Sequence, residues 1–265
     1  MPGRASRGWN EDVGPQPRGP LVTAQVFVTD TGVRVPAVTT TQMREVDRIA
    51  IAWDAPSLQQ MMENAGRALA ETIIEMVGDG WRLQPVVVLA GVGGNGGGGI
   101  CAARHLANHG GDVTVVAGRH ETLGAAAAQQ LEVFRHTGGR LASIDAMSPL
   151  DAALIADAII GYSLAGPPRG EALAMIEWAN VQHAPVLALD VPSGVDATTG
   201  EASGTAISAV ATITLALPKT GLDAPAAGRV WLADIGIPGK VYHQVGIDFE
   251  SPIFDGRFRV ALTPV

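Results

Sequence analysis

GVGGNGGGG, residues 91–99, is the stretch that decides the fold of this chain. It follows an apolar run, Val86 to Ala90, and apolar residues at helical spacing come after it. The order of strand, glycine loop and helix is typical of phosphate-binding turns, because backbone N–H groups and the start of a helix can both approach an anion there. A Gly-x-Gly-x-x-Gly string runs through Gly91, Gly93 and Gly96, but a stretch so rich in glycine matches many patterns. The surrounding chain therefore has to decide what the loop binds.

The composition limits the class of protein. At 265 residues with 47% hydrophobic content, the chain is long enough for one domain with a substantial core. A net charge of -8, a pI near 5.2 and the lack of any Lys/Arg block argue against nucleic-acid and membrane partners. The single cysteine, Cys101, is expected to pack inside a helix and fits a reducing compartment. With no apolar stretch of about 20 residues and no signal peptide, we expect a cytoplasmic protein.

The chain divides into three expected parts. Residues 1–35 contain prolines, glycines and scattered arginines without periodicity, which predicts a flexible leader. Residues 36–247 are expected to form the folded domain, and residues 248–265 a C-terminal extension of unassigned role. The domain opens with two helices. We expect Thr40 and Thr41 to cap the first, with Trp53 on its inner face, and Ser57 to open the second.

Strands and helices alternate after Pro85. The pattern predicts strands near 86–90, 112–117, 154–160, 185–190, 205–217 and 229–234, and helices near 100–109, 122–137 and 171–183. Strands that are apolar throughout and separated by helices indicate a parallel sheet covered on both faces. We therefore predict an α/β fold, a three-layer α/β/α sandwich with a Rossmann-like, mainly parallel sheet.

Three polar turns follow strand ends, and ligands bind in such sheets beyond the carboxyl ends of the strands, where the winding direction reverses. The turns are the glycine loop, residues 161–170 and residues 190–196, and we expect them to meet in one cleft. Asp157 and Asp190 stand at the ends of strands expected to flank the glycine loop. With Asn95 and Ser193 they offer the oxygen ligands that hard cations prefer. Either aspartate can instead cap a turn.

Two further features leave alternatives open. Lys219 follows the long β-forming run, either as an ordinary exposed lysine or as a partner of a phosphate or a developing negative charge. A nicotinamide dehydrogenase needs an acidic residue about 20 residues beyond the loop to hold the ribose. The second strand is followed by Arg119 instead, which disfavours an NAD enzyme and leaves an NADP-dependent oxidoreductase as an alternative.

Taken together, several segments resemble the YjeF amino-terminal domain family, whose enzymes are NAD(P)H-hydrate epimerases. The matching segments, in order between about 38 and 238, are QMREVD (42–47), MENAGR (62–67), the glycine loop with AARHL (102–106), DAIIG (157–161), LDVPSGVD (189–196) and LPK (217–219). The resemblance implies an isomerase that interconverts the R and S forms of NADHX and NADPHX, nicotinamide cofactors hydrated at C6 of the ring. It implies a separate ATP- or ADP-dependent dehydratase as pathway partner. Homodimers are common in the family.

The resemblance also assigns the site. It places Asn95, Asp157 and Ser193 at a potassium ion. Substrate contacts are implied for Gly94, Asn95, Gly96, Gly97, Gly98, Gly161, Tyr162, Ser163, Leu164, Ala165, Gly166, Pro167 and Asp190. Epimerisation requires C6 to lose its configuration, by departure of the hydroxyl or by ring opening, and a carboxyl group can transfer the protons. We expect Asp190 to be that catalytic group and Asp157 to act mainly by positioning the cation.

The loop departs from the family pattern at two positions. The family usually has Asn and Asp where this chain has Gly94 and Gly98, so two polar side chains are missing from the expected pocket. Loss of a group that orients substrate or transfers protons costs on the order of 10²-fold in rate. The alternative reading is therefore a catalytically impaired nucleotide-binding or interaction module on the same fold.

Overall fold

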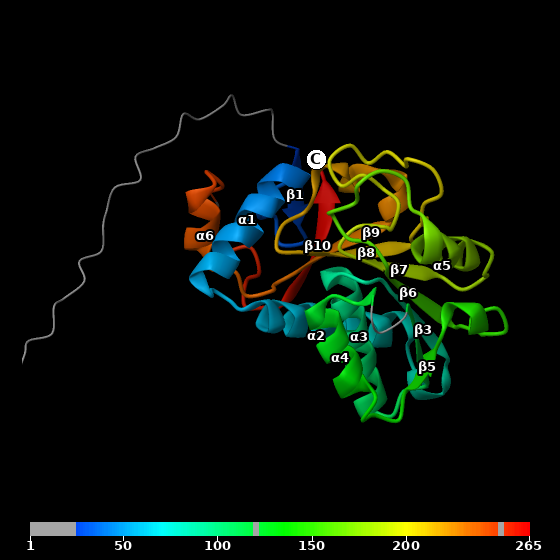
Figure 1. Ribbon diagram of the computed structural model, residues 1–265. Coiled ribbons are helices and arrows are strands. Elements are labelled where there is room, and N and C mark those ends of the chain that lie inside the picture. The colour runs from blue at the N-terminus through cyan, green and yellow to red at the C-terminus, as the bar shows by residue number, and fades with distance from the viewer. Residues whose placement is uncertain (1–24, 119–121, 249–251) are drawn as a thin grey trace, which may run out of the picture.

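The computed structural model describes residues 25–118, 122–248 and 252–265 (Figure 1). Its sheet holds ten strands in the described residues: β1 (Val26–Thr29), β2 (Arg34–Pro36), β3 (Val86–Ala90), β4 (Val113–Ala117), β5 (Arg140–Ala142), β6 (Leu154–Ala158), β7 (Val186–Leu189), β8 (Ala211–Leu215), β9 (Arg229–Ala233) and β10 (Arg259–Pro264). The α-helices are α1 (Thr40–Trp53), α2 (Leu58–Val77), α3 (Gly94–Asn108), α4 (Ala125–Phe134), α5 (Gly170–Asn180) and α6 (Gly239–Gln244). None of the described helices is both long and apolar enough to cross a membrane.

The sheet is mainly parallel, as predicted. Its strand order is β2-β1-β10-β9-β8-β7-β6-β3-β4-β5, and every pair from β9 to β5 is parallel. The chain runs outward from β3 through β4 to β5 and then returns to β6 on the other side of β3. The winding direction therefore reverses between β3 and β6, where a ligand cleft is expected. β7 lies beside β6 and not beside β3, so Asp157 directly flanks the glycine stretch and Asp190 lies one strand further away.

Helices cover both faces of the parallel part of the sheet, which confirms the three-layer α/β arrangement. Alternate residues of β3 divide between the two faces, because successive side chains of a strand point in opposite directions. Val86, Val88 and Ala90 pack in the core beneath α2, α3 and α4. Val87 and Leu89 pack in the core beneath α5. In Figure 1, α2 to α4 and α5 accordingly lie on different sides of the strands.

The sheet extends beyond both of the domain limits expected from the sequence, 36 and 247. β1 and all but the last residue of β2 fall in the range expected to be a leader, yet β1 pairs with β10, which falls in the expected extension. β10 also pairs with β9, so the two ends of the described chain complete the sheet. Together with α1 and α6 they enclose a third core cluster around Phe27, Val35 and Leu262. Residues 1–24 of the expected leader lie outside the described residues.

The first two helices begin close to their predicted starts. Ser57 caps α2 as expected and forms a capping box with Gln60, and Gly78 ends that helix. α1 also has a capping box, but its cap is Thr39, not Thr40 or Thr41. Trp53 is 49% exposed, because it is the last residue of α1 and the chain turns away at Asp54, which has a left-handed backbone conformation.

The glycine stretch is mostly helix. α3 begins at Gly94, so only residues 91–93 form the turn after β3. Close packing explains the glycines inside the helix: a Cβ atom at Gly96 would lie 1.8 Å from the carbonyl oxygen of Gly91, and one at Gly99 would lie 2.4 Å from Cβ of Ala158. Only glycine lets the first turns of α3 approach β6 and the preceding turn this closely. Much of the glycine content therefore serves packing.

Candidate functional site

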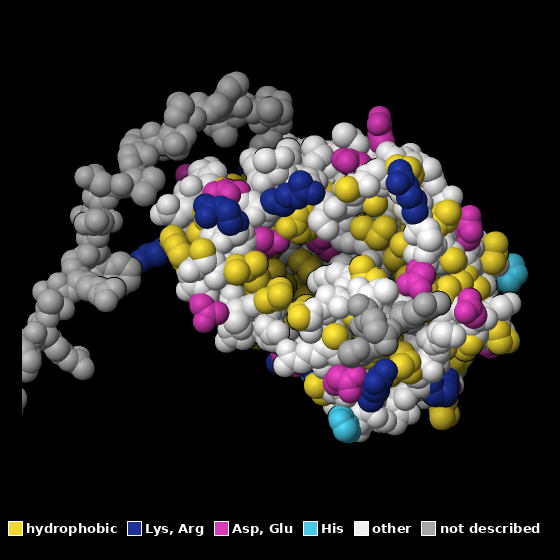
Figure 2. All heavy atoms as spheres, viewed as in Figure 1, with side chains coloured by type: hydrophobic (Ala, Val, Ile, Leu, Met, Phe, Trp, Pro, Cys, Tyr) yellow, Lys and Arg dark blue, Asp and Glu magenta, His cyan; other side chains and the backbone are white. Residues whose placement is uncertain are grey.

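A pocket of about 280 Å³ opens at the point where the sheet reverses its winding direction. Ligand pockets usually measure roughly 300–1,000 Å³, so this one can take a ring-sized group while the rest of a larger ligand lies outside. Figure 2 shows a hollow near the middle of the molecular surface, bordered by hydrophobic side chains. The pocket is lined by Asp47, Ile51, Leu58, Met61, Met62, Ala65, Gly94, Asn95, Gly98, Gly161, Tyr162, Ser163, Leu189, Asp190, Leu215 and Ile235.

The structure brings together seven of the residues predicted to bind substrate or catalyse the reaction. The pocket lining includes Gly94, Asn95, Gly98, Gly161, Tyr162, Ser163 and Asp190. Leu164, Ala165, Gly166 and Pro167 belong to the same turn but are not part of this lining, nor are Gly96 and Gly97. Gly97 faces packed atoms: a Cβ atom there would lie 2.7 Å from the sulfur of Met62. Contacts from these six residues stay a prediction for the parts of a ligand that extend beyond this lining.

Asp190 is the charged centre of the pocket. It follows β7 with a left-handed backbone conformation (φ 72°), and it is 4% exposed. One carboxylate oxygen pairs with Nζ of Lys219, and the other accepts a hydrogen bond from the backbone N–H of Tyr162 at 2.9 Å. Lys219 is 1% exposed and also donates to the carbonyl oxygen of Leu215 at 2.9 Å. The lysine is thus a buried partner of Asp190 and not an exposed side chain.

Asp157 lies beneath the pocket, in β6, and is fully buried. Its carboxylate accepts hydrogen bonds from the Ser193 hydroxyl (2.5 Å), the Ser193 N–H (2.8 Å) and the Ile159 N–H (3.2 Å). Burial raises the pKa of Asp157 to about 6, although these hydrogen bonds oppose the shift. Asp157 and Ser193 therefore support the strand ends from below and are not part of the pocket lining.

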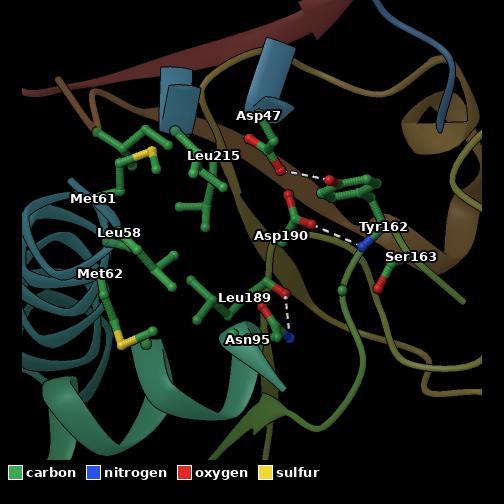
Figure 3. Close-up of a pocket in the computed structure, with 16 residues that line it drawn as sticks. Asp47, Leu58, Met61, Met62, Asn95, Tyr162, Ser163, Leu189, Asp190 and Leu215 are labelled. Carbon is green, nitrogen blue, oxygen red and sulfur yellow. Dashed lines mark hydrogen bonds between the residues drawn. The ribbon is translucent and has the colours of Figure 1, made fainter. Parts of the chain in front are cut away.

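Asn95 and Asp190 face each other across Gly161. A Cβ atom at Gly161 would lie 2.9 Å from a carboxylate oxygen of Asp190 and 3.3 Å from the side-chain oxygen of Asn95. The Asn95 amide donates to the carbonyl oxygen of Leu189 at 3.2 Å, which turns its own oxygen toward this space (Figure 3). Glycine at 161 is needed because any side chain would fill the gap between the two polar groups.

Sequence reasoning missed Asp47 as a site residue. It lies in α1, lines the pocket and accepts a hydrogen bond of 2.5 Å from the Tyr162 hydroxyl (Figure 3). Burial raises the pKa of Asp47, against the lowering effects of the hydrogen bond from Tyr162 and the charge of Lys219. Burial and the nearby Asp47 carboxylate raise the pKa of Tyr162 well above its ordinary range, so its hydroxyl keeps its proton. In the sequence, only the family-like segment QMREVD (42–47) pointed to Asp47.

The wall opposite these polar groups is apolar. Leu58, Met61 and Met62 project from α2 toward Leu189 and Leu215 at the strand ends (Figure 3). Both methionines are buried. They also form one side of the pocket, so a ligand here meets a hydrophobic face on one side and carboxylates on the other.

A separate cluster of Glu63, Cys101 and His105 has ligand atoms within 4.8 Å of one another. Arg104 fills this cluster: its Nη2 atom lies 2.5 Å from a carboxylate oxygen of Glu63 and 3.3 Å from Sγ of Cys101. Burial raises the pKa of the Cys101 thiol to about 12, so it is a poor thiolate ligand. The cluster therefore joins α2 to α3 as an ion-pair network. Arg119, the residue expected to receive a 2′-phosphate in an oxidoreductase, lies outside the described residues.

Comparison with known proteins places these features in a family. Residues 58–221 match the family described as YjeF-related protein N-terminus. The chain is 45% identical over 240 residues to a protein of Dehalogenimonas lykanthroporepellens named NAD(P)H-hydrate epimerase, with 89% of this chain and 97% of that protein covered. It is 37% identical over 218 residues to the bifunctional NAD(P)H-hydrate repair enzyme Nnr of Moorella thermoacetica, with 77% of this chain and 41% of that enzyme covered.

A solved structure has the same fold. The crystal structure of the yeast protein YNL200c matches with a TM-score of 0.69 and 23% sequence identity, covering 86% of this chain and 99% of the yeast chain. At this identity the likeness concerns the fold alone. It agrees with the mainly parallel sheet and the helices on both of its faces.

Proposed function

The chain belongs to the family of YjeF-related protein N-termini, and from this premise we propose that it is an NAD(P)H-hydrate epimerase, an isomerase of hydrated nicotinamide cofactors. The observation that carries the proposal is the joint presence, in one ring-sized pocket, of two carboxylates, an amide and an apolar wall. The 45% identity to a named epimerase over nearly its whole length supports the same activity.

The pocket offers the chemistry that the reaction needs. A hydrated nicotinamide ring can place its apolar edge against Met61, Met62 and Leu189 and its polar substituents toward Asn95 and Asp190, which leaves both faces of C6 accessible. Departure of the C6 hydroxyl leaves positive charge on the ring, and a carboxylate held beside the ring stabilises that charge. Asp190 is the catalytic carboxylate in this proposal. Its buried ion pair with Lys219 suits a group that accepts hydrogen bonds and opposes positive charge.

A potassium ion is the proposed cofactor, held near Asn95, Asp157 and Ser193. The donor set fits a hard cation, because it consists of amide, carboxylate and hydroxyl oxygens. The hydrogen-bond donors to the buried Asp157 carboxylate in the described chain are neutral, so a bound cation would supply the missing positive charge. When bound, the ion would fix the start of α3, which carries Asn95, and the segment after β7, which carries Asp190 and Ser193.

The partners and the location are also part of the proposal. The match to one part of the bifunctional repair enzyme of Moorella supports an ATP- or ADP-dependent dehydratase activity as the partner in the same pathway. A homodimer and a cytoplasmic location are proposed from the sequence considerations above. Sedimentation of the purified chain at several concentrations tests the dimer, and a single monomeric species throughout would overturn it.

Exchange between the two epimers tests the function. Purified R or S forms of NADHX and NADPHX are incubated with the protein in KCl or in choline chloride at equal ionic strength, and the epimers are separated by chromatography. We expect exchange well above the spontaneous rate in KCl, with weaker acceleration in choline chloride. No acceleration in either salt would overturn the epimerase function, and equal acceleration in both would overturn the potassium requirement.

A second candidate function is that of a binding module without turnover. It is favoured by Gly94 and Gly98, which line the pocket but contribute no polar side chain. The same experiment separates the two readings. A protein that binds NAD(P)HX without accelerating exchange is the binding module, whereas accelerated exchange shows that the remaining groups suffice.

A further inference from the structure

Asp190 alone does not account for the proton that the departing C6 hydroxyl group needs. Both of its carboxylate oxygens are engaged, one with the Lys219 ammonium group and the other with the Tyr162 N–H. A hydroxyl group leaves carbon readily only as water, so a second group must supply a proton to it. This step presupposes the epimerase function proposed above.

We propose that Asp47, hydrogen-bonded to the Tyr162 hydroxyl in the same pocket, is a further catalytic residue: the general acid that protonates the departing C6 hydroxyl and recovers the proton through Tyr162. Asp47 and Asp190 hold opposite ends of Tyr162, one at its hydroxyl and the other at its backbone N–H (Figure 3). The two carboxyl groups thus face one pocket in different environments. Such pairs divide acid and base roles between them.

The surroundings of Asp47 suit an acid. Its carboxylate oxygen receives the Tyr162 O–H, while Lys219 is paired with Asp190 and acts on Asp47 only from a distance. Burial raises its pKa, so the protonated form persists to higher pH than for an exposed aspartate. The titratable and charged groups that face Asp47 and its Tyr162 partner are Arg44 from α1, Asp190 after β7, Lys219 after β8, and Tyr242 from α6.

The step balances without any co-reactant. The C6–O bond breaks, its electron pair stays on the oxygen, and the Asp47 proton completes a water molecule. The ring nitrogen supplies an electron pair to form a C6–N double bond, and Asp190 opposes the resulting positive charge. Water then adds to the other face of C6, and the C6–N pair returns to nitrogen. The proton lost by that water passes to the Tyr162 oxygen as the Tyr162 proton moves to the Asp47 carboxylate.

Asp47→Asn and Tyr162→Phe test the proposal, with Glu45→Gln as matched control. Glu45 lies two residues away on α1, is partly exposed, and pairs with Arg48 on the surface, so the same acid-to-amide change there removes no pocket group. We expect Asp47→Asn to lower kcat by about 10²-fold or more with KM changed less than about threefold. Tyr162→Phe should lower kcat as well, and Glu45→Gln should leave both constants unchanged.

Two readouts distinguish catalysis from a structural role. The wild-type kcat should fall as pH rises through the raised pKa of Asp47, because the acid form is the active one, and Asp47→Asn should lose this dependence. In water enriched in oxygen-18, each epimerisation should place one labelled oxygen on C6. Exchange without label, or an Asp47→Asn variant with wild-type kcat and pH profile, would overturn the role of Asp47 while leaving the epimerase function standing. An inactive wild-type chain would overturn both.

Discussion

At the scale of single residues, Lys219 shows how the site is held together. A buried ammonium group is costly unless it is paired, and this one pairs with Asp190 while also donating to the carbonyl oxygen of Leu215. The pair joins the end of β7 to the segment after β8. The lysine therefore determines the position of the carboxylate as well as its charge.

Replacing Lys219 with Met should destabilise the protein strongly. The change leaves Asp190 buried without its counter-charge, which costs about 3–5 kcal/mol in comparable cases. Urea unfolding measures the free energy of unfolding, and Lys240→Met, at an exposed lysine, is the control that should change it by less than about 0.5 kcal/mol. The double variant Lys219→Met/Asp190→Asn should recover part of the loss. A Lys219→Met variant as stable as wild type would show that the ion pair contributes nothing to the fold.

The sequence located some of these residues and not others, for a physical reason. Asn95, Tyr162 and Asp190 follow strand ends, where the topology of a parallel sheet predicts a cleft. Asp47 belongs to a helix 115 residues before Tyr162, and no local pattern connects the two. The burial of Lys219 depends on how the segments after β7 and β8 pack, which the spacing of residues along the chain does not reveal.

At the scale of elements, the first turn of α3 was predicted as loop because glycine disfavours helix on local propensity. Tertiary packing outweighs that preference here. The buried glycines let the helix lie against β6 and the turn after β3, and the helix then places Gly94 and Asn95 at the pocket. The buried parallel strands, by contrast, were predicted, since fully buried strands are apolar at every position, whereas the largely exposed parallel edge strand β5 was missed.

Two alanine substitutions in this turn should therefore behave oppositely. A Cβ atom at Gly94 meets nothing within 4 Å, so Gly94→Ala should leave the free energy of unfolding unchanged or raise it by up to about 1 kcal/mol. A Cβ atom at Gly96 overlaps the backbone of Gly91, which cannot move aside easily, so Gly96→Ala should lose about 3 kcal/mol or more. Urea unfolding of the two variants checks this, and equal stability would contradict the packing explanation.

At the scale of the whole molecule, the two ends of the described chain meet in the sheet. β10 lies between β1 and β9, with Val260 opposite Leu232 and Thr263 opposite Val28. These strands are short, and their partners lie far away in sequence or run antiparallel to them, so residue patterns near them carry no signal of the pairing. The sequence accordingly predicted the parallel centre of the sheet and placed its antiparallel edge outside the domain.

Removal of residues 248–265 should therefore prevent stable folding. The truncation exposes unpaired backbone groups of β9, leaves β1 and β2 as an isolated hairpin, and opens the core around Phe27.

A point variant gives the same test without shortening the chain. Val260→Lys should lower the free energy of unfolding by about 3 kcal/mol or more, because Val260 is 1% exposed and the new ammonium group has no partner there. Thr263→Lys, at an exposed position of the same strand, should change the free energy of unfolding by less than about 0.5 kcal/mol. If the truncated chain and Val260→Lys both unfolded as cooperatively and at the same urea concentration as the full chain, β10 would be an appendage, and the domain would end near 247.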